Sequence, residues 1–344
     1  MKLSSYHKKK GNHTELKLDY KNLHKYDKVY ISKVFTDTEV PCEILELKNV
    51  EYGGTGFFYD KAPPLPKEIE HIMPDYDFYK EWVDEQIKNG RKRKEFEYYL
   101  DYSIGFTTRG CPRGCEFCVN KNSKQSIKHS PISEFLDVSR KYICLQDDNV
   151  FACKDWEEIF KELHSTGKPF TYRQGLDIRL LTEEKSIATS KSKWRGDIIF
   201  AFDNIKDKDI ILKKLKLYRK YNTKVPKFYA FCGFDRNNKW DSEFWNQDII
   251  DIFERLKILM QYNSIPYLTR FNRYEESPYR GTYINLARWC NQPSFFKKMS
   301  YREYCLANGE NSSTVRYMNE FEKDFPEVAN KYYDMKFEEL NQYQ

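Results

Sequence analysis

Glycine is scarce in this chain of 344 residues, with only 14 copies, and long apolar runs are missing. No stretch approaches the roughly 18 consecutive apolar residues of a membrane-spanning helix, and the first twenty residues lack an apolar run of signal-peptide type. We therefore expect a cytoplasmic protein with no membrane partner. Basic and acidic residues nearly balance, at 58 and 52, so the net charge of +6 neither requires nor excludes a nucleic-acid partner.

A disulfide framework is not expected either. The nine cysteines are an odd number, and thiols in a reducing compartment more often serve as metal ligands or reactive groups. Three of them, Cys111, Cys115 and Cys118, lie within eight residues in GFTTRGCPRGCEFCVN. A structural zinc site normally takes a fourth Cys or His, but no second C-x2-C and no H-x3-H is present. A zinc site that recruits the lone His129, or a redox-active cysteine loop, stays an alternative.

Three thiolates on one tight loop can hold three corners of a 4Fe-4S cluster. The fourth iron is then left without a protein ligand, and a substrate or a cofactor can bind there. The spacing of the cysteines therefore favours an iron–sulfur site with one open position.

From residue 101 onward, short β-rich runs alternate with amphipathic helical patterns, which is typical of βα units with parallel strands. The expected strands lie in 102–108, 142–148, 170–176, 198–203, 227–234 and 265–271, and the expected helices in 133–141, 155–167, 182–191, 208–221 and 242–262. The sequence thus predicts an α/β fold in which residues 101–280 form a partial parallel (β/α)6 barrel. Residues 281–344 are expected to form a helical extension.

Residues 1–100 are expected to form a small α/β region and a linker. A strand is predicted in 27–35, and a second apolar stretch in 43–57 breaks at a cluster of glycines. Four prolines between residues 63 and 74 indicate connecting structure. Five basic residues in 88–94 suit a solvated face or, as the alternative, a patch that contacts phosphates.

The pattern C-x3-C-x2-C, with the aromatic Phe117 before the last cysteine, resembles the hallmark of the radical S-adenosylmethionine (SAM) enzymes. The resemblance implies that Cys111, Cys115 and Cys118 ligate a 4Fe-4S cluster, that SAM chelates its fourth iron, and that Phe117 packs near the adenine. It also implies reductive cleavage of SAM to a 5′-deoxyadenosyl radical that abstracts hydrogen from a substrate. An external donor such as flavodoxin or ferredoxin would supply the electron.

The sequence around the cysteines resembles the branch of these enzymes that carries an N-terminal cobalamin-binding domain. The resemblance extends to YICLQDDNVFA, QGLDIRLLTEE, FAFDN and ARWCNQ. This resemblance covers about residues 25–300. The N-terminal region departs from it, because it is short and lacks the D-x-H-x-x-G motif of such domains. We interpret it as a truncated, degenerate domain and do not expect cobalamin to bind.

Several polar residues at predicted strand ends are candidates for cofactor binding. In the family a glycine-rich element meets the methionine amine of SAM, and here Asp147, Asp148 and Asn149 take its place. Their oxygens can accept from an ammonium group, or these residues can instead cap the next helix. Later strand ends add three candidates for contacts to SAM or substrate: Gln174, Arg179 and Asp203. The alternatives are an internal Asp–Arg pair at Arg179 and a turn or N-cap at Asp203.

Two other functions stay open at this point, and the sequence identifies no catalytic residue. The chain could be an iron–sulfur electron-transfer protein without SAM chemistry, or a nucleic-acid-binding protein with a structural cluster. Aromatic and basic residues alternate in KRKEFEYY and RYEESPYRGTY, where they could stack on bases and bind phosphates or simply serve the core and surface.

Overall fold

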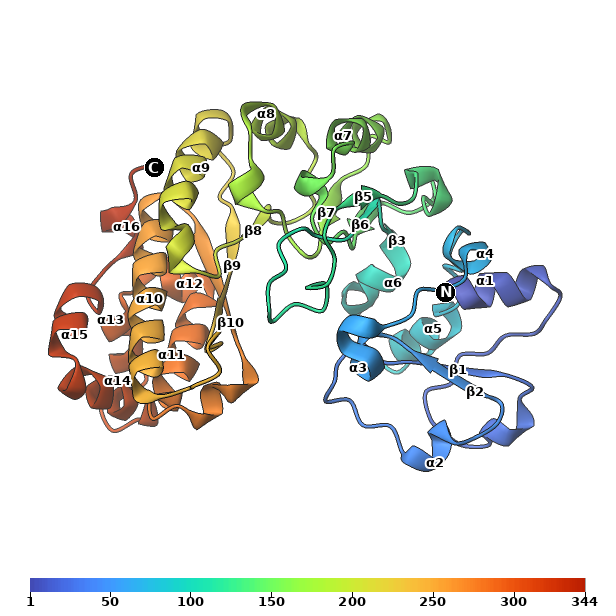
Figure 1. Ribbon diagram of the computed structural model, residues 1–344, viewed down its shortest axis with the longest axis horizontal. Coiled ribbons are helices and arrows are strands. Elements are labelled where there is room, and N and C mark those ends of the chain that lie inside the picture. Colours follow the sequence, from blue (N-terminus) through green and yellow to red (C-terminus); the bar gives the residue numbers. More distant parts are fainter. Residues whose placement is uncertain (344) are drawn as a thin grey trace. The chain divides into compact units, whose positions relative to one another are not determined.

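The computed structural model describes residues 1–343. The chain divides into two compact units, Met1–Phe170 and Thr171–Gln344. Each unit is described by itself below (Figure 1). The three segments expected from the sequence, with boundaries near residues 100 and 280, stay a prediction.

The first unit opens with helix α1 (Lys2–Lys9) and two parallel strands, β1 (Val29–Ser32) and β2 (Val50–Gly53). Both strands lie where the sequence predicted apolar stretches. The short helix α2 (Cys42–Leu45) connects them, and α3 (Thr55–Phe58) follows β2.

A glycine turn joins β2 to α3. Gly54 has a φ of +102°, and a Cβ there would lie 2.3 Å from the carbonyl oxygen of Lys33. A Cβ on Gly56 would lie 2.4 Å from the Lys33 side chain. Only glycine allows this turn to pack so closely on the chain that leaves β1.

Three further helices, α4 (Lys67–Glu70), α5 (Lys80–Lys88) and α6 (Glu97–Asp101), lead to the main sheet of the first unit. That sheet has the order β3-β6-β7, formed by β3 (Tyr102–Gly105), β6 (Tyr142–Leu145) and β7 (Phe170–Tyr172), and β3 pairs with β6 in parallel. The boundary between the two units falls within β7, after Phe170. Three of the four residues of β6 are buried. Such an apolar strand is typical of a parallel sheet covered on both faces.

Helix α7 (Trp156–Ser165) connects β6 to β7, as predicted. The prediction of a helix in 133–141 is wrong. Only a 3₁₀ turn, Ile132–Glu134, forms there. The Asp137 carboxylate accepts hydrogen bonds from the backbone N–H and the hydroxyl of Ser139, at 2.9 and 2.7 Å. This local turn satisfies the backbone without a helix.

The second unit contains a parallel sheet of order β10-β9-β8, formed by β8 (Ile199–Ala201), β9 (Lys227–Cys232) and β10 (Ile265–Arg270). Helices α8 (Glu183–Lys191), α9 (Lys208–Tyr221) and α10 (Ser242–Gln261) lie where the sequence predicted them. Alternate residues of β9 are buried, and two of them, Ala230 and Cys232, join a core formed with α10 and α11 (Arg280–Cys290), which Figure 1 shows beside the sheet.

The second unit ends in a series of helices. After α11 the chain continues through α12 (Pro293–Lys298), α13 (Tyr301–Leu306), α14 (Ser313–Asp324), α15 (Pro326–Tyr332) and α16 (Phe337–Leu340). Aromatic side chains from these helices, among them Tyr301, Phe321 and Tyr332, are buried in the same core as α10.

The predicted α/β class is therefore confirmed. Within residues 1–343 the strands form four separate sheets and no closed barrel. No helix in that part of the chain combines the length and the apolar character needed to cross a membrane.

Candidate functional site

The three clustered cysteines lie on a loop whose two ends meet. Short strands β4 (Thr108–Arg109) and β5 (Ile127–Lys128) pair antiparallel and enclose residues 110–126, which we call the cysteine loop. Gly110 has a φ of +90°, and a Cβ there would lie 2.3 Å from the carbonyl oxygen of Gln125. The close meeting of the loop ends therefore requires glycine at this position.

Inside the loop, the backbone turns tightly around the cysteines. The N–H of Cys118 donates to the carbonyl of Cys115 at 2.9 Å, and the N–H of Asn120 donates to the Cys118 sulfur at 3.4 Å. The N–H of Cys111 donates to the Ser123 hydroxyl at 3.2 Å. All three cysteines are half-buried, and none of the nine cysteines, which all lie in the described part of the chain, forms a disulfide.

The donors of the cysteine loop are of a type that both iron–sulfur clusters and zinc accept. The loop supplies three soft thiol ligands, and the Cys111 and Cys118 sulfurs both accept N–H hydrogen bonds, from Asn149 and Asn120. Hydrogen bonds to the sulfurs are one means by which proteins tune such clusters. In this conformation no group of three or more Cys, His, Asp or Glu side chains within residues 1–343 is placed so that it could hold a metal ion.

The histidine that a zinc site would recruit has other neighbours. His129 stacks on His71 with ring centroids 5.1 Å apart, and its Nε2 lies 3.5 Å from a carboxylate oxygen of Glu70. Burial lowers the pKa of His129, and the positive charge of Arg109 lowers it further. These neighbours of His129 all lie outside the cysteine loop.

Asp147, at the end of β6, is fully buried against the strand end that leads into the cysteine loop. Its two carboxylate oxygens accept four hydrogen bonds of 2.5 to 2.9 Å from the backbone N–H groups and hydroxyls of Thr107 and Thr108. Burial raises the pKa of Asp147, while these four hydrogen bonds oppose the rise. The carboxylate thus fixes the backbone just before β4, a role that the sequence did not suggest.

Asp148 links the two ends of the cysteine cluster. One oxygen accepts from the Gly110 N–H at 2.8 Å, and the other accepts from the side-chain amide of Asn120 at 2.6 Å. Asn149 occupies the N-cap position of a 3₁₀ turn, but its side chain does not cap that turn. It donates instead to the Cys111 sulfur at 3.4 Å. The structure therefore brings Asp148 and Asn149 to the cysteine loop, while a contact of either residue with SAM stays a prediction.

A second group of contacts reaches the loop from the segment after α3. The Tyr59 hydroxyl donates to the carbonyl of Phe117 at 2.8 Å. The Asp60 carboxylate lies 3.2 Å from the Lys121 ammonium and 3.0 Å from the Asn122 side-chain amide. Its hydrogen bond with Lys121 lowers the pKa of Asp60. No spacing or periodicity in the sequence indicated these contacts.

The other three candidates belong to the second unit. Arg179 pairs with Asp177 at 2.8 Å and with Asp207 at 2.7 Å, which is the internal ion pair considered as its alternative. Asp203 follows β8 and accepts from the Phe231 N–H at 3.0 Å. Burial raises the pKa of Asp203. Gln174 lies exposed after β7, beside Gly175.

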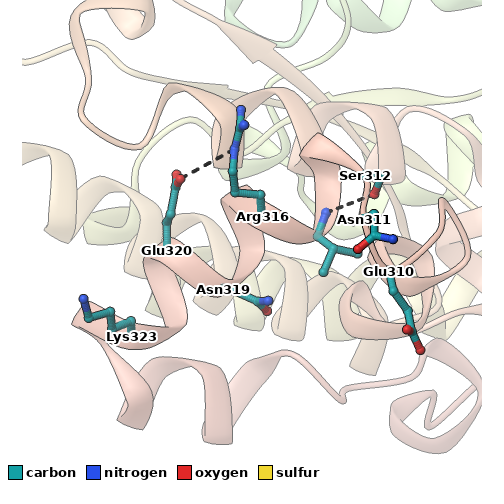
Figure 2. A pocket seen from close by; sticks show the side chains of 8 residues that line it. Glu310, Asn311, Ser312, Arg316, Asn319, Glu320 and Lys323 are labelled. Atoms are coloured by element: carbon teal, nitrogen blue, oxygen red, sulfur yellow. Dashed lines mark hydrogen bonds and ion pairs between the residues drawn. The ribbon is translucent and has the colours of Figure 1, made fainter.

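A shallow hollow on α14 offers no comparable chemistry (Figure 2). Its charged residues include Arg316 and Glu320, which pair with each other at 3.7 Å. The Ser312 hydroxyl, also in the lining, accepts from the Val315 N–H and so caps the helix. This hollow contains no thiol or imidazole.

Neither a protein-family model nor a curated protein matches this chain. A functional assignment therefore depends on the cysteine loop and on the residues that hold it.

Proposed function

We propose that this chain is a radical SAM enzyme in which Cys111, Cys115 and Cys118 bind a 4Fe-4S cluster. The main support is the cysteine loop, where three thiols lie on one short segment whose ends are joined by Asp148. Three cysteine ligands leave one iron open, which is the coordination that SAM needs.

The bound cluster would supply the electron that cleaves SAM to a 5′-deoxyadenosyl radical. The chain itself would hold and shield the reacting groups. Asn149 and the backbone N–H of Asn120 donate to two of the sulfurs, and such bonds stabilise the thiolate form of a ligand. Asp147 and Asp148 keep the backbone before and after the cysteines in place. Phe117 stands before the last cysteine, where the family resemblance assigns it to the adenine.

The partial (β/α)6 barrel is part of this proposal. Its support is that the strands of each main sheet follow chain order, β3-β6-β7 and β8-β9-β10, as successive strands of a βα barrel do. In such a barrel Gln174 and Asp203, which both follow strands, are the remaining candidates for contacts to SAM. Arg179 is a weaker candidate because two carboxylates already bind its guanidinium. We place the reaction in the cytoplasm, with flavodoxin or ferredoxin as the electron donor.

The test is anaerobic reconstitution of the full chain with iron and sulfide, followed by addition of dithionite and SAM and assay of 5′-deoxyadenosine. We expect an iron–sulfur absorption band and formation of 5′-deoxyadenosine. Cys115→Ala should lose both. Cys42→Ala is the matched control, because Cys42 is exposed on α2 outside the loop, and it should retain both.

The outcomes separate the alternatives. A cluster that neither binds nor cleaves SAM would favour an electron-transfer protein. Salt-dependent binding of nucleic acid without SAM cleavage would favour a nucleic-acid-binding protein with a structural cluster. A Cys115→Ala variant that still carries a SAM-cleaving cluster would refute the proposal.

A further inference from the structure

The cysteine loop is held on a second side by two consecutive residues that lie outside it. Tyr59 binds the carbonyl of Phe117, the residue before Cys118. Asp60 binds the side chains of Lys121 and Asn122, which follow Cys118. The two residues therefore contact the loop on both sides of its last cysteine.

The segment that carries them is itself firmly placed. The N–H of Lys33 donates to the Gly53 carbonyl at 3.0 Å, and the N–H of Gly56 donates back to the Lys33 carbonyl at 2.9 Å. The Thr55 hydroxyl adds a hydrogen bond of 3.0 Å to the Val34 carbonyl. Because a side chain at Gly56 would overlap Lys33, this turn has no room to shift toward β1.

Tyr59 also adopts an uncommon backbone conformation. Its φ is +43°, in the left-handed region that residues other than glycine rarely occupy. Such a conformation persists where the surrounding contacts hold it, and it often marks a functional position. Here those contacts include the hydrogen bond to the cysteine loop and the Lys121 ammonium, which lies 5.4 Å from the centre of the Tyr59 ring.

We propose that Tyr59 and Asp60 are positioning residues that restrain the cysteine loop on both sides of Cys118 before a cluster binds. The inference rests on the proposed function and adds a role for the N-terminal region. The glycine turn after β2 would then serve to carry these two side chains to the cysteines.

The first test uses the full chain without a cluster. Tyr59→Phe and Asp60→Asn each remove one set of contacts and keep the size of the side chain. Tyr52→Phe and Glu51→Gln are matched controls on neighbouring β2, since no hydrogen bond or ion pair from them to the cysteine loop is found among the described residues. Alkylation of individual thiols by iodoacetamide is followed by peptide mass spectrometry, with the exposed Cys42 as an internal reference.

We expect Tyr59→Phe and Asp60→Asn each to raise the alkylation rates of Cys115 and Cys118 by up to about fivefold, the factor that corresponds to one hydrogen bond. The double variant should show a larger increase, and the rate at Cys42 should not change. Backbone hydrogen exchange should also accelerate at Cys118 and Lys121, whose N–H groups bond within the loop. Rates equal to those of the wild type and the two controls would overturn the inference.

The second test uses reconstituted protein and a ferrous chelator. The double variant should bind the same initial amount of iron as the wild type but lose it several times faster, and its cluster potential should shift. Failure of the wild type to bind a cluster would overturn the proposed function, whereas the thiol rates would still decide whether Tyr59 and Asp60 hold the loop. A bound cluster with unchanged rates of iron loss and unchanged thiol rates would overturn the positioning role alone.

Discussion

Asp147→Asn is the substitution that tests most directly how the strand end before the cysteine loop is held. The wild-type carboxylate accepts the Thr107 N–H on one oxygen and the Thr108 N–H on the other, at 2.9 and 2.5 Å. Asparagine has nearly the same shape but only one oxygen. Its NH₂ group must therefore face one of these two N–H groups, in a place that water does not reach.

The expected cost follows from these contacts. A buried N–H without an acceptor costs about 1–3 kcal/mol, and bonds to a charged acceptor are stronger than the neutral bonds that replace them. Relief from burying a charge offsets part of this cost, because burial raises the pKa of Asp147. The threonine hydroxyls can turn to accept from the new NH₂ group. We therefore expect the free energy of unfolding of the first unit to fall by about 2–3 kcal/mol.

The measurement must separate the two compact units, because a single spectroscopic signal would combine them. Urea-dependent hydrogen exchange of peptides from residues 102–108 and 142–149 reports on the first unit alone. Glu81→Gln, an exposed charge in α5, is the control and should change stability by about 0.5 kcal/mol or less. If Asp147→Asn changes the free energy no more than this control does, then the four hydrogen bonds do not stabilise the strand end and our reasoning is refuted.

Two further predictions concern the same unit. Gly105→Ala should lower its free energy of unfolding by about 1–3 kcal/mol, because the new Cβ would lie 2.3 Å from the Phe135 ring. Gly53→Ala, also at a strand end but with no atom within 4 Å of its Cβ, is the control in the same denaturation assay, and equal effects would contradict the packing argument. The Asp101 pKa lies below its usual 3.8, chiefly through the hydrogen bonds from Arg93. Arg93→Met should therefore destabilise at neutral pH, with the difference vanishing as acid titrates Asp101, whereas a difference independent of pH would disprove this linkage.

The sequence predicted the repeating elements well, because they have a local physical cause. All six strands expected after residue 101 form, and the long helix α10 covers residues 242–261 of the expected 242–262. A run of β-branched and aromatic residues or an apolar stripe determines such elements from within one segment. The helix expected in 133–141 failed because the Asp137 side chain bonds to Ser139 two residues on, a competition that periodicity does not reveal.

The contacts of the candidate site were much less predictable. The cysteine spacing identified the loop, since all three thiols lie in one short segment. The partners of that loop are distant in the chain, however: Tyr59 and Phe117 are 58 residues apart. The sequence indicated that Asp147, Asp148 and Asn149 lie near the site. It could not show that Asp147 holds the strand end whereas Asp148 holds the loop. That division depends on which side chains tertiary packing brings within hydrogen-bonding distance.

Asp148 acts as a non-covalent clasp that makes a ring of residues 110–120, since one carboxylate holds the first residue and the last. Closing a ring lowers the entropy of the chain. Here the ring closes when the protein folds and brings Asp148, which follows β6, to the loop, so this entropy is lost before any ligand binds. The backbone between the two held ends has hydrogen bonds of its own, from the Cys118 N–H to the Cys115 carbonyl and from the Tyr59 hydroxyl to the Phe117 carbonyl. One carboxylate thus closes the segment, so a substitution at Asp148 should loosen both ends of the ring at once, whereas a substitution at the exposed Glu116 should change the structure little.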